Sequence, residues 1–424
     1  MTPKAQSIKK TRPSASARRK ASSVRTVTRF FGGNATDAYE YFGAHLAKDK
    51  KSCVFRVYAP NADRVSVCGD FNSWDPRVTP MQRISETGIW EAIVEGGIPS
   101  HCKYKYFVRG IEKNAFKSDP FGVCAEKNFN AASAIEPVEE YSWRDGGWLA
   151  YRKGRFTREA MEEQPIHVYR MDPLFWKRHG DGAPYSCREL ASDLIPYVKQ
   201  MGYTHVELLG VTGGSSHDGK AVDALFAPSP CFGEPWELMA LIDSMHEAGI
   251  GVILSWSPFA FAASEHGLSE FDGTFLYEYE TEQGSVRHFD LGKAEVQSLL
   301  LSSALFWTKQ YHADGLSVKP SVVAKISEGG KKNPRGREIA FLRKLHTRMA
   351  TEAPDVMIIT EKTAGIRISM MGSEIGDTWE EGRERELSWQ LLDERENAEK
   401  QLFTAKANHK SLSLPTGGKT NRNQ

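Results

Sequence analysis

The stretch YSCRELASDLIPYVKQMGYTHVELLGV, residues 185–211, decides how the larger part of this chain folds. It predicts a helix from about Cys187 to Met201, followed by the short apolar run THVELLGV, which is typical of a buried strand. The same alternation continues on both sides. Further helical stretches lie around 235–248, 294–311 and 337–350, and the strand-like runs are IHVYRM (166–171), THVELLGV (204–211), GVILSW (251–256), DGLSV (314–318) and VMIIT (356–360). Five such units in succession favour a parallel (β/α) barrel of TIM type over a short doubly wound sheet.

We expect this barrel to be incomplete. Three further β/α units of about 30 residues each would need roughly 90 residues after Glu361, but the sequence ends at residue 424. The stretch 379–406 is instead rich in Glu, Arg, Gln and Lys, which predicts one exposed or partner-facing helix. An open parallel sheet has unpaired edges and an uncovered apolar face. Three alternatives follow. The segment from Gly365 covers the sheet, a partner chain covers it, or the protein is a marginally stable remnant.

Upstream of residue 141 the pattern changes to short strands separated by turn residues. The strand-like runs are CVFRVYAP (53–60), RVSVCGDF (64–71), IWEAIVEG (89–96) and YKYFVRG (104–110). Apolar and polar positions alternate within them, as in strands with one buried face. Asn61 to Asp63 and Gly96-Gly97 supply turns. This region predicts an immunoglobulin-like β-sandwich.

The N-terminal segment differs from both regions. It contains no acidic residue from Met1 to Arg29, is rich in Lys, Arg, Ser and Thr, and has almost no large apolar residue before Phe30. This composition predicts a disordered basic tail over residues 1–36. A solvated tail is favoured over an arm that contacts nucleic acid, an acidic protein or another polyanionic surface.

Overall composition limits the classes of function. Lysine plus arginine (55) balances aspartate plus glutamate (54), so nucleic acid is not expected as the main partner. We find neither a membrane-span pattern nor a signal-peptide pattern, which predicts a cytoplasmic protein. The six cysteines form no CxxC pair, and we expect reduced, mostly buried thiols with no metal site and no cofactor.

Several segments resemble one known family. They are the stretch 185–208, His266-Gly-Leu-Ser-Glu-Phe-Asp-Gly-Thr-Phe-Leu-Tyr-Glu-Tyr279, Ala304-Leu-Phe-Trp307 and Tyr311-His-Ala-Asp-Gly-Leu316. Together they resemble bacterial glycogen (1,4-α-glucan) branching enzymes, members of glycoside hydrolase family 13 in the α-amylase superfamily. Upstream, Gly69-Asp-Phe-Asn-Ser-Trp74 and Lys103-Tyr-Lys-Tyr-Phe107 resemble the family 48 carbohydrate-binding module that precedes such barrels.

The resemblance implies that the catalytic nucleophile is missing. Retaining enzymes of this kind need two carboxylates about 5 Å apart beside a cationic transition state. The family's nucleophile is the aspartate of a GLRVDA-like motif, which here reads Gly315-Leu-Ser-Val-Lys-Pro320, so that Lys319 takes the nucleophile's place and Ser317 that of the family's arginine. A lysine lacks the attacking oxygen and reverses the charge. For Lys319, a structural role in which it pairs with Glu361 is favoured over a role as a lysine that forms a Schiff base.

The other sugar-binding positions implied by the resemblance are altered too. Ser255 and Ala260 stand where the family's DxVxxH-like motif has its aspartate and histidine, and Lys220 stands where its WGYQ motif has a stacking tyrosine. A YEVH-like turn becomes Tyr169-Arg-Met-Asp172. Only the general-acid position remains, as Glu361, and the HDE-type motif has no counterpart. A lone acid does not make a glycosidase.

The sandwich keeps more of the family's binding residues. Sugar rings bind by lying on aromatic faces while their hydroxyls form hydrogen bonds. Trp74 and Lys105 match positions that contact glucan in some family 48 modules, with a structural loop anchor as the alternative for Trp74. Trp90 is a candidate second ring or a core residue. Gly110-Ile-Glu-Lys113 stands where glycogen-binding relatives carry a second tryptophan, which predicts weak binding.

We therefore predict a non-catalytic α-glucan-binding or regulatory relative of branching enzymes. Alternatives are an active branching enzyme or α-glucan hydrolase, and an interaction scaffold without sugar affinity. The expected partners are an α-glucan such as glycogen, and a glycogen-metabolism enzyme or a second copy that covers the open barrel. The expected organisation is a basic tail (1–36), a carbohydrate-binding sandwich (37–140), an incomplete barrel (141–364) and a charged helix with a tail (365–424).

Overall fold

The computed structural model describes most of the 424-residue chain. The described residues are 15–110, 113–126, 132–155, 166–213, 224–280, 284–318, 334–360, 366–371, 373, 400–402 and 404–409. Lys220, Lys319 and Glu361 lie outside them, as does most of the helix expected at 379–406. Within the described part, no helix is both long enough and apolar enough to cross a bilayer.

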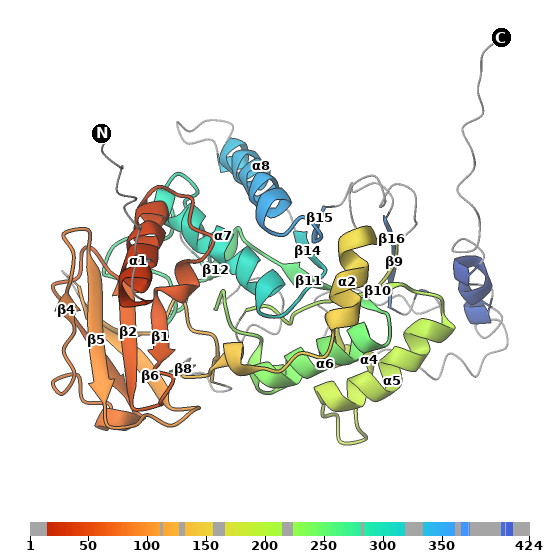
Figure 1. The fold of residues 1–424 in the computed structure, drawn as a ribbon, viewed down its shortest axis with the longest axis horizontal. Helices are drawn as coiled ribbons and strands as arrows, with labels where there is room; N and C mark the ends of the chain where they lie inside the picture. The colour runs from red at the N-terminus through yellow and green to blue at the C-terminus, as the bar shows by residue number, and fades with distance from the viewer. Residues whose placement is uncertain are drawn as a thin grey trace, which may run out of the picture.

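The N-terminal part of the structure, from β1 to β8, is a β-sandwich, as predicted (Figure 1). One antiparallel sheet has the order β1 (Gly43–Leu46), β2 (Ser52–Tyr58), β5 (Ile89–Glu95), β4 (Gln82–Arg83). The other has the order β3 (Arg64–Gly69), β6 (Lys103–Arg109), β7 (Asn114–Lys117), with β8 (Ser133–Ala134) also paired to β6. The alternating apolar positions fill the core, since Val65, Val67, Tyr104, Tyr106 and Val108 are all buried.

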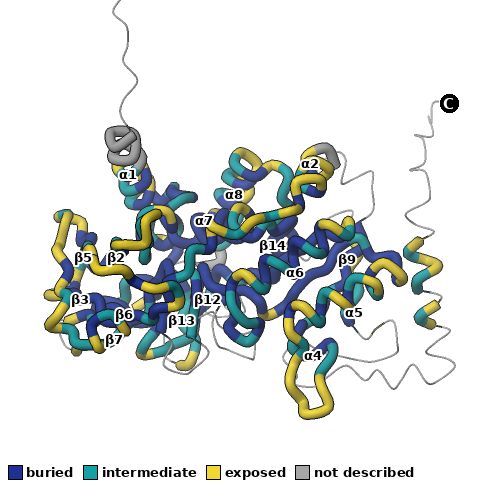
Figure 2. The backbone as a smooth tube through the Cα atoms, turned by 60° about the horizontal axis from the view of Figure 1, so that its bottom comes forward, coloured by how far each residue is buried: buried dark blue, intermediate teal, exposed yellow. Residues whose placement is uncertain are grey.

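The part of the chain after the sandwich contains the five predicted parallel strands in their predicted order. They are β9 (Ile166–Met171), β10 (His205–Leu208), β11 (Gly251–Trp256), β14 (Gly315–Val318) and β15 (Met357–Ile359). The connecting helices are α5 (Cys187–Gln200), α6 (Pro235–Glu247), α7 (Ala294–Lys309) and α8 (Pro334–Glu352). The strands are buried (Figure 2), and helices α5 and α8 each have an exposed side, whereas α7 is buried along most of its length. Helices packed on a buried parallel sheet are the layering of a (β/α) barrel.

Shorter elements complete the described fold. They are α2 (Gly146–Arg155), α4 (Pro173–Trp176), the 3₁₀ turns η1 (Ala38–Glu40), η2 (Asp70–Asn72), η3 (Val138–Glu140) and η4 (Pro230–Phe232), and an antiparallel pair of β12 (Ala260–Ala262) with β13 (Val286–His288). In the sequence the β12–β13 pair lies between β11 and α7, and the residues between its two strands contact the sandwich, where the backbone N–H of Asn61 donates to Asp272.

A sixth strand that the sequence did not predict covers one edge of the barrel sheet. β16 (Ile366–Met370) follows β15 in the chain, but it pairs with β9 at the opposite edge, in parallel, from Ile366 opposite Ile166 to Met370 opposite Arg170. The segment that follows Gly365 thus covers the β9 edge of the sheet. This was one of the three alternatives for the open sheet, the others being cover by a partner chain and a marginally stable protein. Its IRISM sequence is short and followed by charged residues, so its pattern alone did not identify a strand.

The last described helical residues contact the sheet near the same edge. Asn408 lies 3.2 Å from the ring of His167 and donates to the Met201 carbonyl oxygen at 2.9 Å. The close approach depends on Gly202, whose φ is +72°, because a Cβ there would lie 3.1 Å from the Cβ of Asn408. The chain just beyond the helix predicted at 379–406 is therefore packed against the barrel.

The prediction of a disordered tail over residues 1–36 is wrong for the described part, which begins at Ala15. Helix α1 (Ala15–Phe31) ends with Phe30, which is buried against Phe42 at a ring-centroid distance of 4.7 Å. Beyond it, the backbone N–H groups of Ala35 and Ala38 donate to serine hydroxyls of α7. A few apolar anchors and buried hydrogen bonds order a segment whose average composition is that of a solvated tail.

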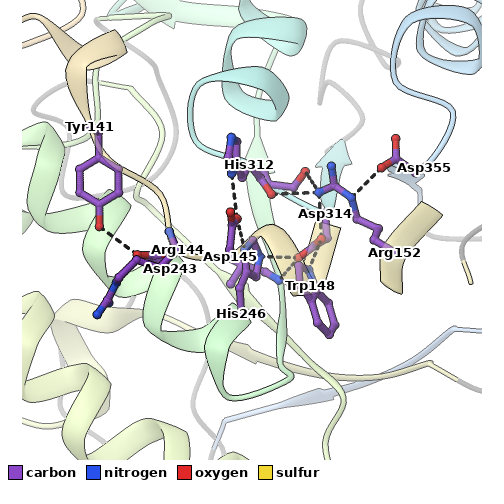
Figure 3. Close-up of polar contacts among 12 residues, drawn as sticks. Tyr141, Arg144, Asp145, Trp148, Arg152, Asp243, His246, His312, Asp314 and Asp355 are labelled. Atoms are coloured by element: carbon purple, nitrogen blue, oxygen red, sulfur yellow. Dashed lines mark hydrogen bonds and ion pairs between the residues drawn. The ribbon is translucent and has the colours of Figure 1, made fainter. Parts of the chain in front are cut away.

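A buried polar cluster lies at the amino-terminal ends of the barrel strands (Figure 3). His246 lies between two carboxylates, with Asp145 at 2.9 Å from Nδ1 and Asp314 at 2.9 Å from Nε2. Carboxylates only accept hydrogen bonds, so both ring nitrogens carry protons and the imidazole is charged. Trp148 and Arg152, both from α2, also donate to Asp314, at 2.8 and 3.0 Å. We call these five residues the His246 cluster.

The charges of the His246 cluster stabilise one another. Burial alone would lower the pKa of His246, but the charges of Asp314 and Asp145 outweigh it and leave this pKa raised. Burial also opposes ionisation of Asp314, yet the charges of His246 and Arg152 hold its pKa well below its usual value. The cluster therefore joins α2 and the segment before it to the barrel sheet.

We expect His246→Gln to lower the free energy of unfolding by about 3–5 kcal/mol, because two buried carboxylates lose their shared cation. The pKa of His246 is raised, so its stabilising charge is complete below the unfolded imidazole pKa of about 6.5 and is lost as pH rises through the folded pKa. Urea unfolding at pH 6 and pH 9 should therefore show a larger difference between wild type and variant at pH 6.

The matched control is His179→Gln, at a partly exposed histidine beside Glu189, and it should change unfolding little at either pH. A difference between wild type and His246→Gln that does not vary with pH would contradict the charged state assigned to His246.

Candidate carbohydrate-binding site

The inner face of the barrel sheet carries some of the residues singled out from the sequence. Ser255 of β11 and Ser317 of β14 are register partners on neighbouring strands, and both are buried. Ala260 lies beyond the sheet, at the start of β12. The structure thus brings Ser255 and Ser317 together near the carboxyl ends of their strands, where barrel enzymes place catalytic residues.

Sequence reasoning did not single out an ion pair on the same sheet. Arg170 of β9 donates through Nε to Oε2 of Glu207 on β10 at 2.8 Å, and Glu207 is fully buried. The other carboxylate oxygen, Oε1, has no hydrogen-bond partner among the described residues. A charged residue inside the apolar run THVELLGV was the available signal, because a glutamate in a buried strand needs a partner.

A pocket on the sandwich brings together two of the predicted sugar-binding residues. It has a volume of about 470 Å³. Its lining residues are Asp70, Trp74, Lys103, Lys105, Phe116, Glu126, Ala132 and His266. Trp74 comes from the loop after β3 and Lys105 from β6, so two segments that are separate in the sequence meet at one surface. We call this the sandwich pocket.

The loop that carries Trp74 is held in an unusual conformation. Both Ser73 (φ 54°) and Trp74 (φ 60°) adopt the left-handed region, which costs of order 1 kcal/mol or more for each residue that is not glycine. The indole Nε1 donates to Asp70 Oδ1 at 3.0 Å, and Asp70 Oδ2 accepts from the Lys103 backbone N–H at 2.9 Å. Strain that persists in an otherwise well-bonded loop points to a function for the side chain it presents.

Hydrogen bonds beneath this loop fix its shape. The side chain of Asn72 is buried and accepts from the Gly69 backbone N–H at 2.9 Å. Its amide group donates to the Val67 carbonyl oxygen and to the Thr79 hydroxyl, both at 2.9 Å. The tryptophan is thus presented by a loop whose backbone is tied to β3.

The sandwich pocket contains both cationic and anionic groups. Lys103 forms an ion pair with Glu126 at 2.6 Å. Lys105 is almost completely buried, and its ammonium forms no hydrogen bond or ion pair with the described residues. Burial lowers the pKa of Lys105, an effect that the charge of Glu126 partly opposes. A partly desolvated donor beside carboxylate acceptors suits a ligand with many hydroxyl groups.

Trp90 does not line this pocket, so of the two roles that the sequence left open, a second sugar-binding ring or a core residue, the structure favours the core residue. It lies in β5, in the other sheet of the sandwich, and is only 7% exposed. Its indole Nε1 donates to the Ala59 carbonyl oxygen at 2.9 Å, which satisfies the only donor of the ring. Trp90 is a core residue because its position in β5 faces the interior of the sandwich.

Comparisons with known proteins agree with both halves of the fold. Residues 41–122 match the family Carbohydrate-binding module 48 (Isoamylase N-terminal domain). The chain is 38% identical over 347 residues to the 1,4-alpha-glucan branching enzyme GlgB of Bacillus subtilis, covering 78% of this chain and 54% of that protein. It is 40% identical over 359 residues to the enzyme of the same name from Aquifex aeolicus, covering 79% and 56%. The chain spans about half the length of these curated relatives.

Solved structures confirm the fold. A pullulanase from Paenibacillus barengoltzii in complex with maltohexaose and alpha-cyclodextrin superposes with a TM-score of 0.59 at 16% identity. The match covers 76% of this chain and 53% of that one. The predicted architecture, a sandwich followed by an incomplete (β/α) barrel, and the resemblance to branching enzymes are both confirmed.

The contrast between the two tryptophans can be tested by stability. Trp90→Ala should lower the free energy of unfolding by about 3–5 kcal/mol, because it leaves a cavity in the sandwich core. Trp74→Ala should change it by less than about 1 kcal/mol, because the ring is partly exposed. Denaturant unfolding of each variant gives both values, and similar losses in the two would contradict these assignments.

Proposed function

From the relation of this chain to 1,4-α-glucan branching enzymes, we propose that it binds α-glucan, such as glycogen, through the sandwich pocket and does not catalyse glucan transfer or hydrolysis. The observation that carries the proposal is that Trp74 and Lys105 line one pocket, with the tryptophan held in a strained, well-bonded loop. An aromatic face and adjacent hydrogen-bonding groups are the features that recognise sugar rings.

The pocket suits a short stretch of a sugar polymer. Its volume of about 470 Å³ falls within the usual range for small-molecule sites, roughly 300–1,000 Å³. One platform ring supports modest affinity for a single chain end, so tight binding to a polymer would depend on many weak contacts to a branched particle. We therefore expect clear binding to glycogen and weak binding to a single oligosaccharide.

The non-catalytic part of the proposal rests on the residues at the strand ends. Lys319 replaces the attacking carboxylate that the family's motif would supply. Ser317 stands in place of the arginine of the same motif, and its neighbour on the sheet, Ser255, stands in place of the aspartate of the DxVxxH-like motif. The buried carboxylate of Glu207 is already balanced by Arg170, so this ion pair leaves no unpaired negative charge to stabilise a cationic transition state.

The identity to the curated branching enzymes favours a second candidate, an active α-glucan branching enzyme or hydrolase. It requires a nucleophile other than the residue at 319. The two candidates differ in one observable, which is turnover of amylose.

Binding is tested by co-sedimentation of the purified chain with glycogen. We expect wild type to sediment and Trp74→Ala to lose about ten- to thirtyfold in affinity, as truncation of a central tryptophan does at other binding sites. The matched control is Trp236→Ala, an exposed tryptophan of α6 outside the pocket, which should bind like wild type. If wild type does not sediment, the interaction scaffold without sugar affinity becomes the better account.

Turnover is tested by iodine staining and by reducing-end release on amylose. We expect wild type and Glu361→Gln to give the same background signal, because a general acid without a nucleophile does not support the covalent step. Activity in wild type that Glu361→Gln abolishes would establish the active branching enzyme or hydrolase instead.

A further inference from the structure

The sandwich pocket is not made by the sandwich alone. His266 lines it together with Trp74 and Lys105, although it lies between β12 and β13 in the barrel region. We infer that His266 is a further ligand-contacting residue, so that the glucan site is a composite of sandwich and barrel. This inference rests on the proposed glucan binding and adds the part of the site that the barrel supplies.

Direct hydrogen bonds hold the His266 loop against β7. The Ser118 backbone N–H donates to the His266 carbonyl oxygen at 2.7 Å. The ring nitrogen Nδ1 of His266 lies 3.0 Å from the carbonyl oxygen of Phe116, another pocket residue. The position of His266 is thus determined by the strand that forms part of the pocket.

Lys117 reinforces the same junction from within. Its side chain is 2% exposed and its ammonium donates to the carbonyl oxygens of Glu265 and Ser269, at 2.7 and 2.6 Å. Burial lowers the pKa of Lys117 to about 8, which is the cost of placing an amine there. These bonds hold the residues on both sides of His266, so the loop approaches the pocket as a fixed element.

The hydrogen bond of His266 determines what its ring can offer a ligand. A carbonyl oxygen can only accept, so Nδ1 carries the proton that is donated to Phe116. In the neutral imidazole Nε2 is then an acceptor, and it forms no hydrogen bond with a described residue. A sugar hydroxyl can donate to this nitrogen while it accepts a hydrogen bond from Lys105.

This arrangement gives the barrel a role that requires no catalysis. The ligand would contact Trp74 and Lys105 on the sandwich and His266 on the barrel side. Binding then depends on the two parts being docked, which the contacts of Lys117 and Ser118 maintain.

The test is isothermal titration calorimetry of maltoheptaose into the full chain. Loss of one hydrogen bond predicts that His266→Ala binds about three- to tenfold more weakly than wild type. His266→Gln keeps a side-chain acceptor and should stay within about threefold of wild type. The matched control is His179→Ala, a histidine outside the pocket, which should bind like wild type.

A second measurement removes any dependence on the folding of a variant. In the ¹⁵N-histidine-labelled wild-type chain, the Nε2 resonance of His266 should shift as maltoheptaose is added, and that of His179 should not. Two outcomes would overturn the composite site and leave the sandwich pocket intact. One is a folded His266→Ala variant with unchanged affinity. The other is a His266 resonance that does not move although Trp74→Ala still weakens binding. If wild type binds no maltoheptaose and does not sediment with glycogen, the proposed glucan binding itself is wrong.

Discussion

The rest of the structure depends on the charge balance around His246. One imidazolium is shared by Asp145, which lies just before α2, and Asp314, which lies just before β14. Asp314 also accepts from the backbone N–H of Val252 in β11, so the same carboxylate contacts two neighbouring strands and α2. Buried charges are stable only when each has its partner, and this requirement fixes how the segment after the sandwich passes beneath the barrel sheet.

Much of the fold could be predicted from the sequence because apolar strand-like runs alternate regularly with helical stretches. The five runs from IHVYRM to VMIIT became neighbouring parallel strands, since apolar runs that alternate with amphipathic helices have few other arrangements. β16 could not be predicted, because five residues of mixed polarity define no period and its pairing with β9 is a tertiary event. The order of the segment around Phe30 depends in the same way on contacts with residues far along the chain.

The candidate site shows the same limit at the level of single residues. Trp74 and Lys105 could be named from local motifs, and the structure brings them to one pocket. The sequence fitted Trp90 equally well as a sugar-stacking ring and as a core residue, and only its burial in the structure distinguished the two roles. His266 was quoted within a family-like segment, but its approach to the sandwich follows from the packing of β7 against a distant loop. Sequence patterns report local chemistry well, whereas the composition of a pocket between two parts of a fold is decided by their docking.

The left-handed backbone at Ser73 and Trp74 has a consequence for the thermodynamics of binding. A flexible loop that closes on a sugar must lose conformational entropy at that moment, and affinity falls by the amount of ordering required. Here the indole is already oriented by its bond to Asp70, and the loop beneath it is fixed by Asn72. The ordering has taken place during folding, so even a single ring would retain most of its contact energy with the glucan ligand proposed above.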